Sequence, residues 1–225
     1  MNVAIIVAAG SGSRFGAEKP KQFYEILGKP LLIHTLEKFE SCQDIDEIIL
    51  ILSAAAIENF RETLSKYQIE KLSKIIAGGE TRAASVDKGL KAIDGATIEI
   101  VAVHDGARPL VTVEEITKTI EKARDTGAAC LVAKVTDTIK QVADGKIVNT
   151  IDRANLRRAL TPQCFRYEIL RRAFAENEIG ETVTDECFLV EKLGHEIAIV
   201  EGSAKNIKIT LPEDFILAES LLKQL

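Results

Sequence analysis

Residues 3–22 read VAIIVAAGSGSRFGAEKPKQ, and this segment carries the clearest structural signal in the sequence. It begins with seven small or β-branched apolar residues, as expected for a strand that is buried on both faces. The loop that follows contains Gly10, Gly12 and Gly16 and the cations Arg14, Lys19 and Lys21. Glycine lets backbone N–H groups approach anionic oxygens without a Cβ clash, and cations neutralise the remaining charge. The segment therefore predicts a buried strand that leads into a polyphosphate-binding loop.

The spacing of these glycines differs from two common phosphate-binding motifs. The dinucleotide-binding fingerprint has its third glycine one residue earlier than Gly16, and a Walker A loop has a Gly-Lys-Ser/Thr sequence that is missing here. A glycine-rich turn that binds no ligand is the alternative for the glycines alone. Arg14 and Lys21 argue against it, because cations gathered in one loop are less expected in a chain of net charge −5.

The composition is that of an ordinary globular protein, with 46% hydrophobic and 28% charged residues, and a length of 225 residues suits one large domain or one domain with an appendage. The net charge argues against nucleic-acid binding, and no apolar run approaches the roughly 20 residues of a membrane span. The cysteines lie far apart without a C-x-x-C pair, and the first apolar run does not resemble a secretory signal. We therefore expect reduced thiols and a cytoplasmic location.

Short apolar, β-rich runs alternate with amphipathic helical patterns. We expect strands at residues 3–8, 47–52, 74–77, 98–104 and 128–134. We expect helices at residues 31–40, 54–67, 82–93, 113–126 and 212–225. The fourth helix has a capping box of Thr112 and Glu115, and the last opens with Thr210 and Glu213 around Pro212. This order predicts an α/β fold with a mainly parallel sheet and helices on both faces.

The alternation stops between residues 136 and 153. Two β-rich segments, residues 137–142 and 146–151, flank Asp144-Gly145, a strong hairpin-turn signal, and no helix separates them. We expect an antiparallel β-arm that projects from the parallel sheet. Because an isolated hairpin is marginally stable, it should pack against something, either a second subunit or its own domain.

The loops that follow the first, third and fourth strands contain glycines, acids and arginines. They are the segment from Gly10 to Lys21, the segment GGETR with Ser85, and the segment HDGARP, which includes Asp105 and Arg108. In open α/β sheets, ligands bind beyond the carboxyl ends of the strands. Taken singly, Asp105 could brace a loop and Arg108 could be a surface cation. Together, the three loops favour a ligand site.

Six groups of short motifs occur in order along nearly the whole chain. They are AAGSGSRFG with KPKQF, GGETRAASV, HDGARP, IDR with ALTPQ, TDE with VEKLG, and EGSAKNIKIT with PEDF. In this order they resemble the 2-C-methyl-D-erythritol 4-phosphate cytidylyltransferases of the non-mevalonate isoprenoid pathway. The resemblance implies a single Rossmann-like nucleotidyltransferase domain over residues 1–225, with a β-arm at about residues 136–153 that embraces a partner in a homodimer.

The same resemblance implies the reaction. CTP and 2-C-methyl-D-erythritol 4-phosphate would give 4-diphosphocytidyl-2-C-methyl-D-erythritol and pyrophosphate by in-line attack of the substrate phosphate on the α-phosphorus of CTP. That nucleophile is already anionic, so the reaction needs positioning and positive charge rather than a general base. Mg²⁺ would be held mainly by the CTP phosphates, with Asp105 as the one carboxylate suspected of helping.

The resemblance also assigns roles to residues. Arg14 and Lys21 match residues that stabilise the transition state, and Arg153 and Lys208 match a catalytic pair that positions the attacking phosphate. The implied nucleotide contacts are Ala8, Ala9, Gly10, Gly12, Gly79, Glu80 and Ser85. The implied contacts to the sugar phosphate are Asp105, Arg108, Thr138, Arg153, Thr161 and Lys208. Thr138 and Thr161 are expected to reach across from the partner subunit. Lys205 departs from the family's pattern, and we interpret it as an exposed cation rather than a further phosphate contact.

Three other functions are considered. Ribitol 5-phosphate cytidylyltransferases share several motifs, but the Asp152-Arg153 pair, ALTPQ and TDE favour the methylerythritol enzymes. A nicotinamide-dependent reductase would use Tyr67 and Lys71, although the glycine spacing argues against it. A catalytically silent nucleotide-binding protein is disfavoured by the four cations of the catalytic set.

Overall fold

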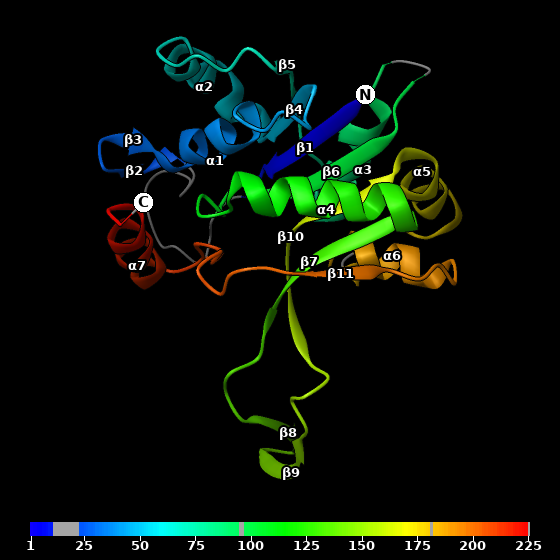
Figure 1. The fold of residues 1–225 in the computed structure, drawn as a ribbon. Helices are drawn as coiled ribbons and strands as arrows, with labels where there is room; N and C mark the ends of the chain where they lie inside the picture. The colour runs from blue at the N-terminus through cyan, green and yellow to red at the C-terminus, as the bar shows by residue number, and fades with distance from the viewer. Residues whose placement is uncertain (11–22, 95–96, 181, 225) are drawn as a thin grey trace.

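The protein is described from a computed structural model, which covers residues 1–10, 23–94, 97–180 and 182–224. Its centre is a seven-stranded sheet in the order β11-β7-β10-β6-β1-β4-β5 (Figure 1). The strands are β1 (Asn2–Ala8), β4 (Glu47–Leu52), β5 (Leu72–Ala77), β6 (Ile100–Asp105), β7 (Ala128–Lys134), β10 (Arg157–Arg166) and β11 (Ala198–Glu201). Only β10 runs antiparallel to its neighbours, and the other pairings are parallel. The predicted α/β fold with a mainly parallel sheet is confirmed.

Helices cover both faces of this sheet. On one face, α1 (Leu31–Glu40), α2 (Ile57–Leu64) and α4 (Val113–Thr126) bury their apolar sides in one core cluster. On the other face, α3 (Arg82–Lys91), α5 (Tyr167–Glu176) and α6 (Glu186–Lys192) form a second cluster. Successive residues of β1 point to opposite clusters, since Ile5 belongs to the second and Ile6 to the first. This explains why the run from Val3 to Ala8 is apolar at every position.

The helix α4 shows how well the local signals work where they are strong. Glu115 accepts the backbone N–H of Thr112 while the Thr112 hydroxyl accepts the N–H of Glu115, which is the expected capping box. The helix ends at Gly127, whose φ of 92° suits glycine.

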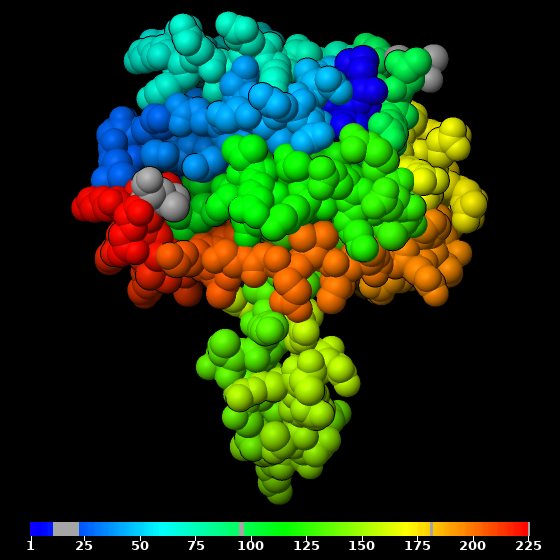
Figure 2. Space-filling view, in the orientation of Figure 1, coloured from blue at the N-terminus to red at the C-terminus, as the bar shows by residue number. Residues whose placement is uncertain are grey.

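The β-arm is formed by β8 (Ile139–Ala143) and β9 (Lys146–Ile151), which pair with each other in a separate two-stranded sheet. Asp144 and Gly145 take positive φ angles of 50° and 73°, as the hairpin signal predicts. The arm projects well away from the body of the molecule (Figures 1 and 2). The alternative in which the arm folds back onto its own domain is therefore wrong.

The sequence interpretation was less complete after the arm. It did not predict β10, α5, α6 or β11, and it extended the last helix past its observed end, α7 (Pro212–Leu222). The expected start of α7 at Pro212 is confirmed, but the capping carboxylate is corrected. Asp214, not Glu213, accepts the backbone N–H groups of Thr210 and Leu211.

Smaller differences lie in the first half. The expected helix at residues 54–67 is a 3₁₀ turn, η3 (Ala54–Ala56), followed by the shorter α2. A small hairpin of β2 (Glu25–Ile26) and β3 (Lys29–Pro30) precedes α1.

Among the described residues, no helix combines the length and apolar character needed to cross a membrane.

Candidate active site

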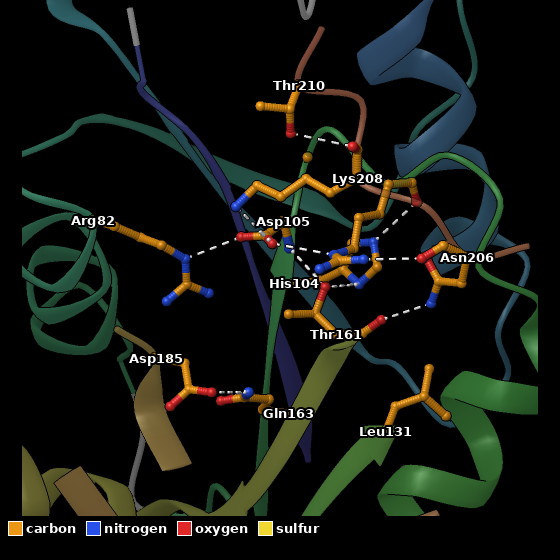
Figure 3. A network of polar contacts seen from close by, with 12 residues as sticks. Arg82, His104, Asp105, Leu131, Thr161, Gln163, Asp185, Asn206, Lys208 and Thr210 are labelled. Carbon is orange, nitrogen blue, oxygen red and sulfur yellow. Dashed lines mark hydrogen bonds and ion pairs between the residues drawn. The ribbon is translucent and has the colours of Figure 1, made fainter. Parts of the chain in front are cut away.

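The carboxyl end of β6 places one carboxylate, Asp105, among three cations, of which Figure 3 labels Arg82 and Lys208. Its Oδ1 lies 3.0 Å from Arg82 Nε, and its Oδ2 lies 3.2 Å from Arg108 Nε and 3.0 Å from Lys208 Nζ. Lys208 is the most accessible of the three, with 36% of its side chain exposed against 23% for Arg82 and 11% for Arg108. Lys208 is therefore the cation best placed to meet a ligand at this edge of the sheet.

The charge of Asp105 is held by these neighbours. Burial acts to raise the pKa of its carboxyl, but the charges of Arg82, Lys208 and Arg108 outweigh burial and hold the pKa well below 3.8. The carboxylate is thus ionised at neutral pH, and it compensates for the cations gathered around it.

His104, the residue before Asp105, is held in one neutral tautomer. Its Nε2 lies 3.2 Å from the carbonyl oxygen of Arg108, which can only accept, so Nε2 carries the proton. Nδ1 then accepts the hydroxyl proton of Thr161 at 3.0 Å, and the Thr161 oxygen in turn accepts the N–H of Asp105 at 3.1 Å. Burial lowers the pKa of His104 to about 3, which agrees with the neutral ring. His104 therefore braces the loop and does not act as a base.

The segment that carries Lys208 is joined to the same loop by buried hydrogen bonds. Arg108 Nη1 donates to the carbonyl of Asn206 at 2.9 Å, and Asn206 Nδ2 donates to the carbonyl of Thr161 at 3.0 Å. The N–H of Ile209 donates to the carbonyl of Ala107 at 2.9 Å. Because residues 206–209 are attached on both sides of Lys208, its ammonium group is held beside Asp105 rather than free in solvent.

A second part of this edge is packed too closely for side chains. A Cβ on Gly78 would lie 2.4 Å from Cβ of Ala9, and a Cβ on Gly79 would lie 2.6 Å from Cβ of Ala84. The hydroxyl of Ser85 accepts the N–H of Gly79 at 3.1 Å and donates to the carbonyl of Thr81. The end of β1 and the start of α3 therefore meet, and both glycines are required there.

Comparisons with known proteins agree over the whole length of the chain. The family model for 2-C-methyl-D-erythritol 4-phosphate cytidylyltransferase matches residues 2–224. The chain is 44% identical to the cytidylyltransferase of that name from Bacillus velezensis. The 223 aligned residues cover 98% of this chain and 95% of the relative. The homologue from Clostridium perfringens is also 44% identical, over 224 residues that cover 98% of each chain.

Solved structures give the same result. The 4-diphosphocytidyl-2C-methyl-D-erythritol synthase of Anaerococcus prevotii matches with a TM-score of 0.85 at 32% identity, covering 99% of this chain and 96% of that one. The cytidylyltransferase of Thermus thermophilus matches with a TM-score of 0.77 at 33% identity, covering 99% and 100%. The chain belongs to the 2-C-methyl-D-erythritol 4-phosphate cytidylyltransferase family. It is therefore a nucleotidyltransferase, and the ribitol 5-phosphate alternative is not favoured.

The structure of this cytidylyltransferase brings some of the expected site residues together. Asp105, Arg108, Thr161 and Lys208 form one connected cluster. Ala9 and Ser85 both lie beside Gly78, and Ser85 binds the N–H of Gly79, while Gly10 and Glu80 are exposed. Ala8 instead lies against Gly106, on the other face of the sheet. Gly12, Arg14 and Lys21, like Gly16 and Lys19, lie outside the described residues.

Other expected contacts are separated. Thr138 is exposed in the arm, and Arg153 donates to the carbonyl of Thr136 at the base of the arm. Lys208 pairs with Asp105 instead, so Arg153 and Lys208 share no partner in the contacts of the described residues. The expectation that Thr161 reaches across from a partner subunit is wrong, because its hydroxyl is buried between His104 and Asp105 of its own chain.

The structure also adds residues that the sequence interpretation left without a role, namely Arg82, His104, Gln163, Glu186 and Asn206. Each lies inside a motif quoted above, so the motifs marked their positions but not their partners. The structure does not support the reductase interpretation. Lys71 Nζ donates to the carbonyl of Cys42 at 2.7 Å, and Cys42 precedes the amino end of β4, whereas ligands bind beyond the carboxyl ends of the strands.

The ion pairs of Asp105 predict a pH dependence. Because the pKa of Asp105 is lower in the folded protein than its ordinary value, the stability that Asp105 contributes is complete above about pH 4 and is lost only as the pH falls through the folded-state pKa. We expect Asp105→Asn to lower the free energy of unfolding by about 3 kcal/mol, equally at about pH 8 and pH 5. Urea denaturation followed by circular dichroism measures this difference. A difference that shrinks between those two pH values would mean that Asp105 titrates there, against the geometry.

Proposed function

We propose that the buried cluster around Asp105 holds the sugar-phosphate substrate of the family reaction. The observation that carries the proposal is the accessible ammonium group of Lys208, held 3.0 Å from an ionised carboxylate at the carboxyl end of β6. Lys208 and Arg108 would bind the phosphate of 2-C-methyl-D-erythritol 4-phosphate and aim one of its oxygens at the α-phosphorus of CTP. The attack forms the new P–O bond in line with the departing pyrophosphate.

The chemistry of the cluster suits an anionic nucleophile. The phosphate needs no deprotonation, and His104, the only histidine in the cluster, is neutral, buried and fully hydrogen-bonded. What the site supplies is fixed positive charge, which lowers the repulsion between two anionic substrates. Arg14 and Lys21 are proposed to add the charge that faces the triphosphate.

We propose that the complete site needs a second copy of the chain. The arm exposes Val142, Ile147 and Val148 by 60%, 66% and 57%, on a hairpin that would be marginal alone. Exposed apolar clusters of this kind typically belong to interfaces. In a homodimer built through the arms, Arg153 and Thr138 of one subunit would reach the cluster around Asp105 of the other. A dimer of this kind would place Arg153 and Lys208 on the same substrate phosphate, which one chain alone does not do.

Magnesium is proposed as a companion of CTP rather than a resident of the protein. Among the described residues, no group of three or more histidine, cysteine, aspartate or glutamate side chains could hold a metal ion. Both oxygens of Asp105 already face cations, so Asp105 does not fit as a ready metal ligand. A hard divalent cation bound by the triphosphate would offset its charge.

We also propose that the enzyme works in the cytoplasm. Cys42, Cys130, Cys164 and Cys187 are all buried free thiols, and free thiols persist in a reducing compartment.

Pyrophosphate release tests the reaction directly. Purified enzyme with CTP and Mg²⁺ should release pyrophosphate with 2-C-methyl-D-erythritol 4-phosphate and much less with ribitol 5-phosphate. Preference for the ribitol substrate would keep the site and change the assigned substrate. No release with either substrate, from protein whose fold is verified by circular dichroism, would contradict the proposal.

A further inference from the structure

Arg82 joins two buried carboxylates that come from distant parts of the chain. Its Nε lies 3.0 Å from Oδ1 of Asp105 at the end of β6, and its Nη1 lies 2.6 Å from Oε1 of Glu186 at the start of α6. The guanidinium group is planar and rigid, so holding one edge fixes the direction of the other. Glu186 therefore determines which edge of Arg82 faces Asp105.

Glu186 is itself firmly placed. Its backbone N–H and that of Cys187 donate to Oε1 of Gln163, at 3.2 and 3.1 Å. The other end of the Gln163 amide donates to Oδ2 of Asp185, whose Oδ1 caps α6 by accepting the N–H of Phe188 (Figure 3 shows the Gln163–Asp185 contact). Gln163 lies on β10 beside β6. The start of α6 is thus tied to the strand next to the one that ends in Asp105.

The contact with Arg82 fixes the orientation of the Asp105 carboxylate. Arg82 occupies Oδ1, which leaves Oδ2 for Arg108 and Lys208. With both carboxylates ionised, Asp105 and Glu186 offset two of the three positive charges of Arg82, Arg108 and Lys208. One net positive charge remains, and it lies towards Lys208, the most exposed of the three cations.

Burying the Glu186 carboxylate costs free energy of folding. Its side chain is fully buried, and Oε2 has no hydrogen-bond partner among the described residues. Burial raises the pKa of its carboxyl, and the charge of Arg82 only partly offsets this effect. A well-packed apolar residue would often be neutral or stabilising at such a position. The cost is explained if Glu186 serves the reaction rather than the fold.

We propose that Arg82 and Glu186 are positioning residues for cytidylyl transfer. Glu186 holds Arg82, and Arg82 orients the carboxylate of Asp105 so that its second oxygen, Oδ2, keeps Lys208 and Arg108 aimed at the substrate phosphate. Neither residue needs to touch a substrate to do this. The proposal rests on the proposed role of Lys208 in binding that phosphate.

The test uses two conservative variants of the full chain. Arg82→Lys keeps the charge but cannot reach both carboxylates, and Glu186→Gln keeps the shape and one acceptor but removes the charge. Each should lower kcat/KM for the sugar phosphate by about tenfold to a hundredfold, because a small misplacement of a group that positions the substrate can cost up to about a hundredfold. The KM for CTP should stay within about threefold of wild type, since Lys208 is not expected to contact the nucleotide.

The double variant shows whether the two residues act together. If Glu186 acts only through Arg82, Arg82→Lys with Glu186→Gln should be no slower than Arg82→Lys alone, whereas independent roles give multiplied losses. Glu40→Gln is the control, because the Glu40 carboxylate is likewise hydrogen-bonded, accepting the backbone N–H of Lys71, but lies at the end of α1 and outside the Asp105 cluster. It should have wild-type kinetics. Thermal unfolding of every variant identifies any loss of activity that comes from loss of the fold.

Several results would overturn the proposal. Wild-type kinetics in both single variants would do so, as would multiplied losses in the double variant. A rise in the KM for CTP with no change for the sugar phosphate would place Arg82 at the nucleotide instead. Lys208→Ala, measured beside them, separates the two levels. If Lys208→Ala is impaired and the other variants are not, only this inference fails, and if Lys208→Ala is fully active, the proposed site fails with it.

Discussion

Lys208→Ala should lower kcat/KM by about a hundredfold to a thousandfold, the loss expected when one preorganised charged contact to the reacting groups is removed. The ammonium group is already fixed beside Asp105 in the free protein, so little reorganisation is needed when the substrate phosphate binds. The fold should survive, because Arg82 and Arg108 still pair with Asp105. Steady-state pyrophosphate release and thermal unfolding measure the two effects.

Lys205→Ala is the control for this variant. Lys205 is also a cation on the same segment, but it is exposed, as the sequence interpretation expected. Its hydrogen bonds use the backbone: its N–H donates to the Ser203 hydroxyl oxygen, and its carbonyl accepts the N–H of Ile207. Loss of that side chain should leave the kinetics unchanged. Equal losses in the two variants would mean that general positive charge, rather than the position of Lys208, matters for the reaction.

Mixing two inactive variants tests whether the site is shared between subunits. If Lys208 of one subunit works with Arg153 of its partner, a mixed dimer of Lys208→Ala and Arg153→Ala contains one intact site. Equal mixing with full subunit exchange should restore about one quarter of wild-type activity, because half the dimers are mixed and each has one working site of two. A site built within one chain would restore nothing, since every site would then carry one lesion.

The fold up to the end of the arm was predictable because its signals are local and strong. The bounds of α1, β4, α4, β7 and β9 agree with the apolar patterns, and Thr112, Glu115 and Gly127 mark the ends of α4 as expected. Strands that are apolar at every position leave few alternatives to a parallel sheet covered on both faces. Asp144-Gly145 similarly fixed the turn of the arm.

The part of the fold that follows the arm was not predictable in this way. Pro162 lies inside β10, and proline within a run argues against a central strand, yet β10 lies between β6 and β7 with a shift of register near this point. β11 has four residues and α6 has seven, which is too short for a reliable period. These elements are stabilised by tertiary packing that sequence periodicity does not report.

The site was predictable in its residues but not in its connections. The strand-end rule placed Asp105, Arg108, Gly79 and Ser85 at one edge of the sheet. It could not show that Arg82 pairs with Glu186, which is 104 positions away. The family resemblance led to the wrong subunit for Thr161, whose position depends on β10, a strand that was not predicted.

The arm has physical properties that separate its role from that of the body. It pairs only with itself in the described sheets, and its apolar side chains face solvent, while the core clusters contain no residue of β8 or β9. Its removal should therefore cost the body little stability. If it supplies both the dimer contact and Arg153, its removal should nevertheless cost nearly all the activity.

Replacing residues 137–154 with a short glycine-rich linker between β7 and β10 should give a folded monomer without measurable turnover, because Thr138 and Arg153 are lost together with the dimer contact. Analytical ultracentrifugation, thermal unfolding and pyrophosphate release measure the three properties. The triple variant Val142→Thr, Ile147→Thr and Val148→Thr keeps β-branched residues and Arg153 but makes the apolar surface polar, so it should shift the dimer towards monomer and regain activity at high enzyme concentration. A truncated monomer with wild-type turnover would instead place the whole site within one chain, and the arm would then need another explanation.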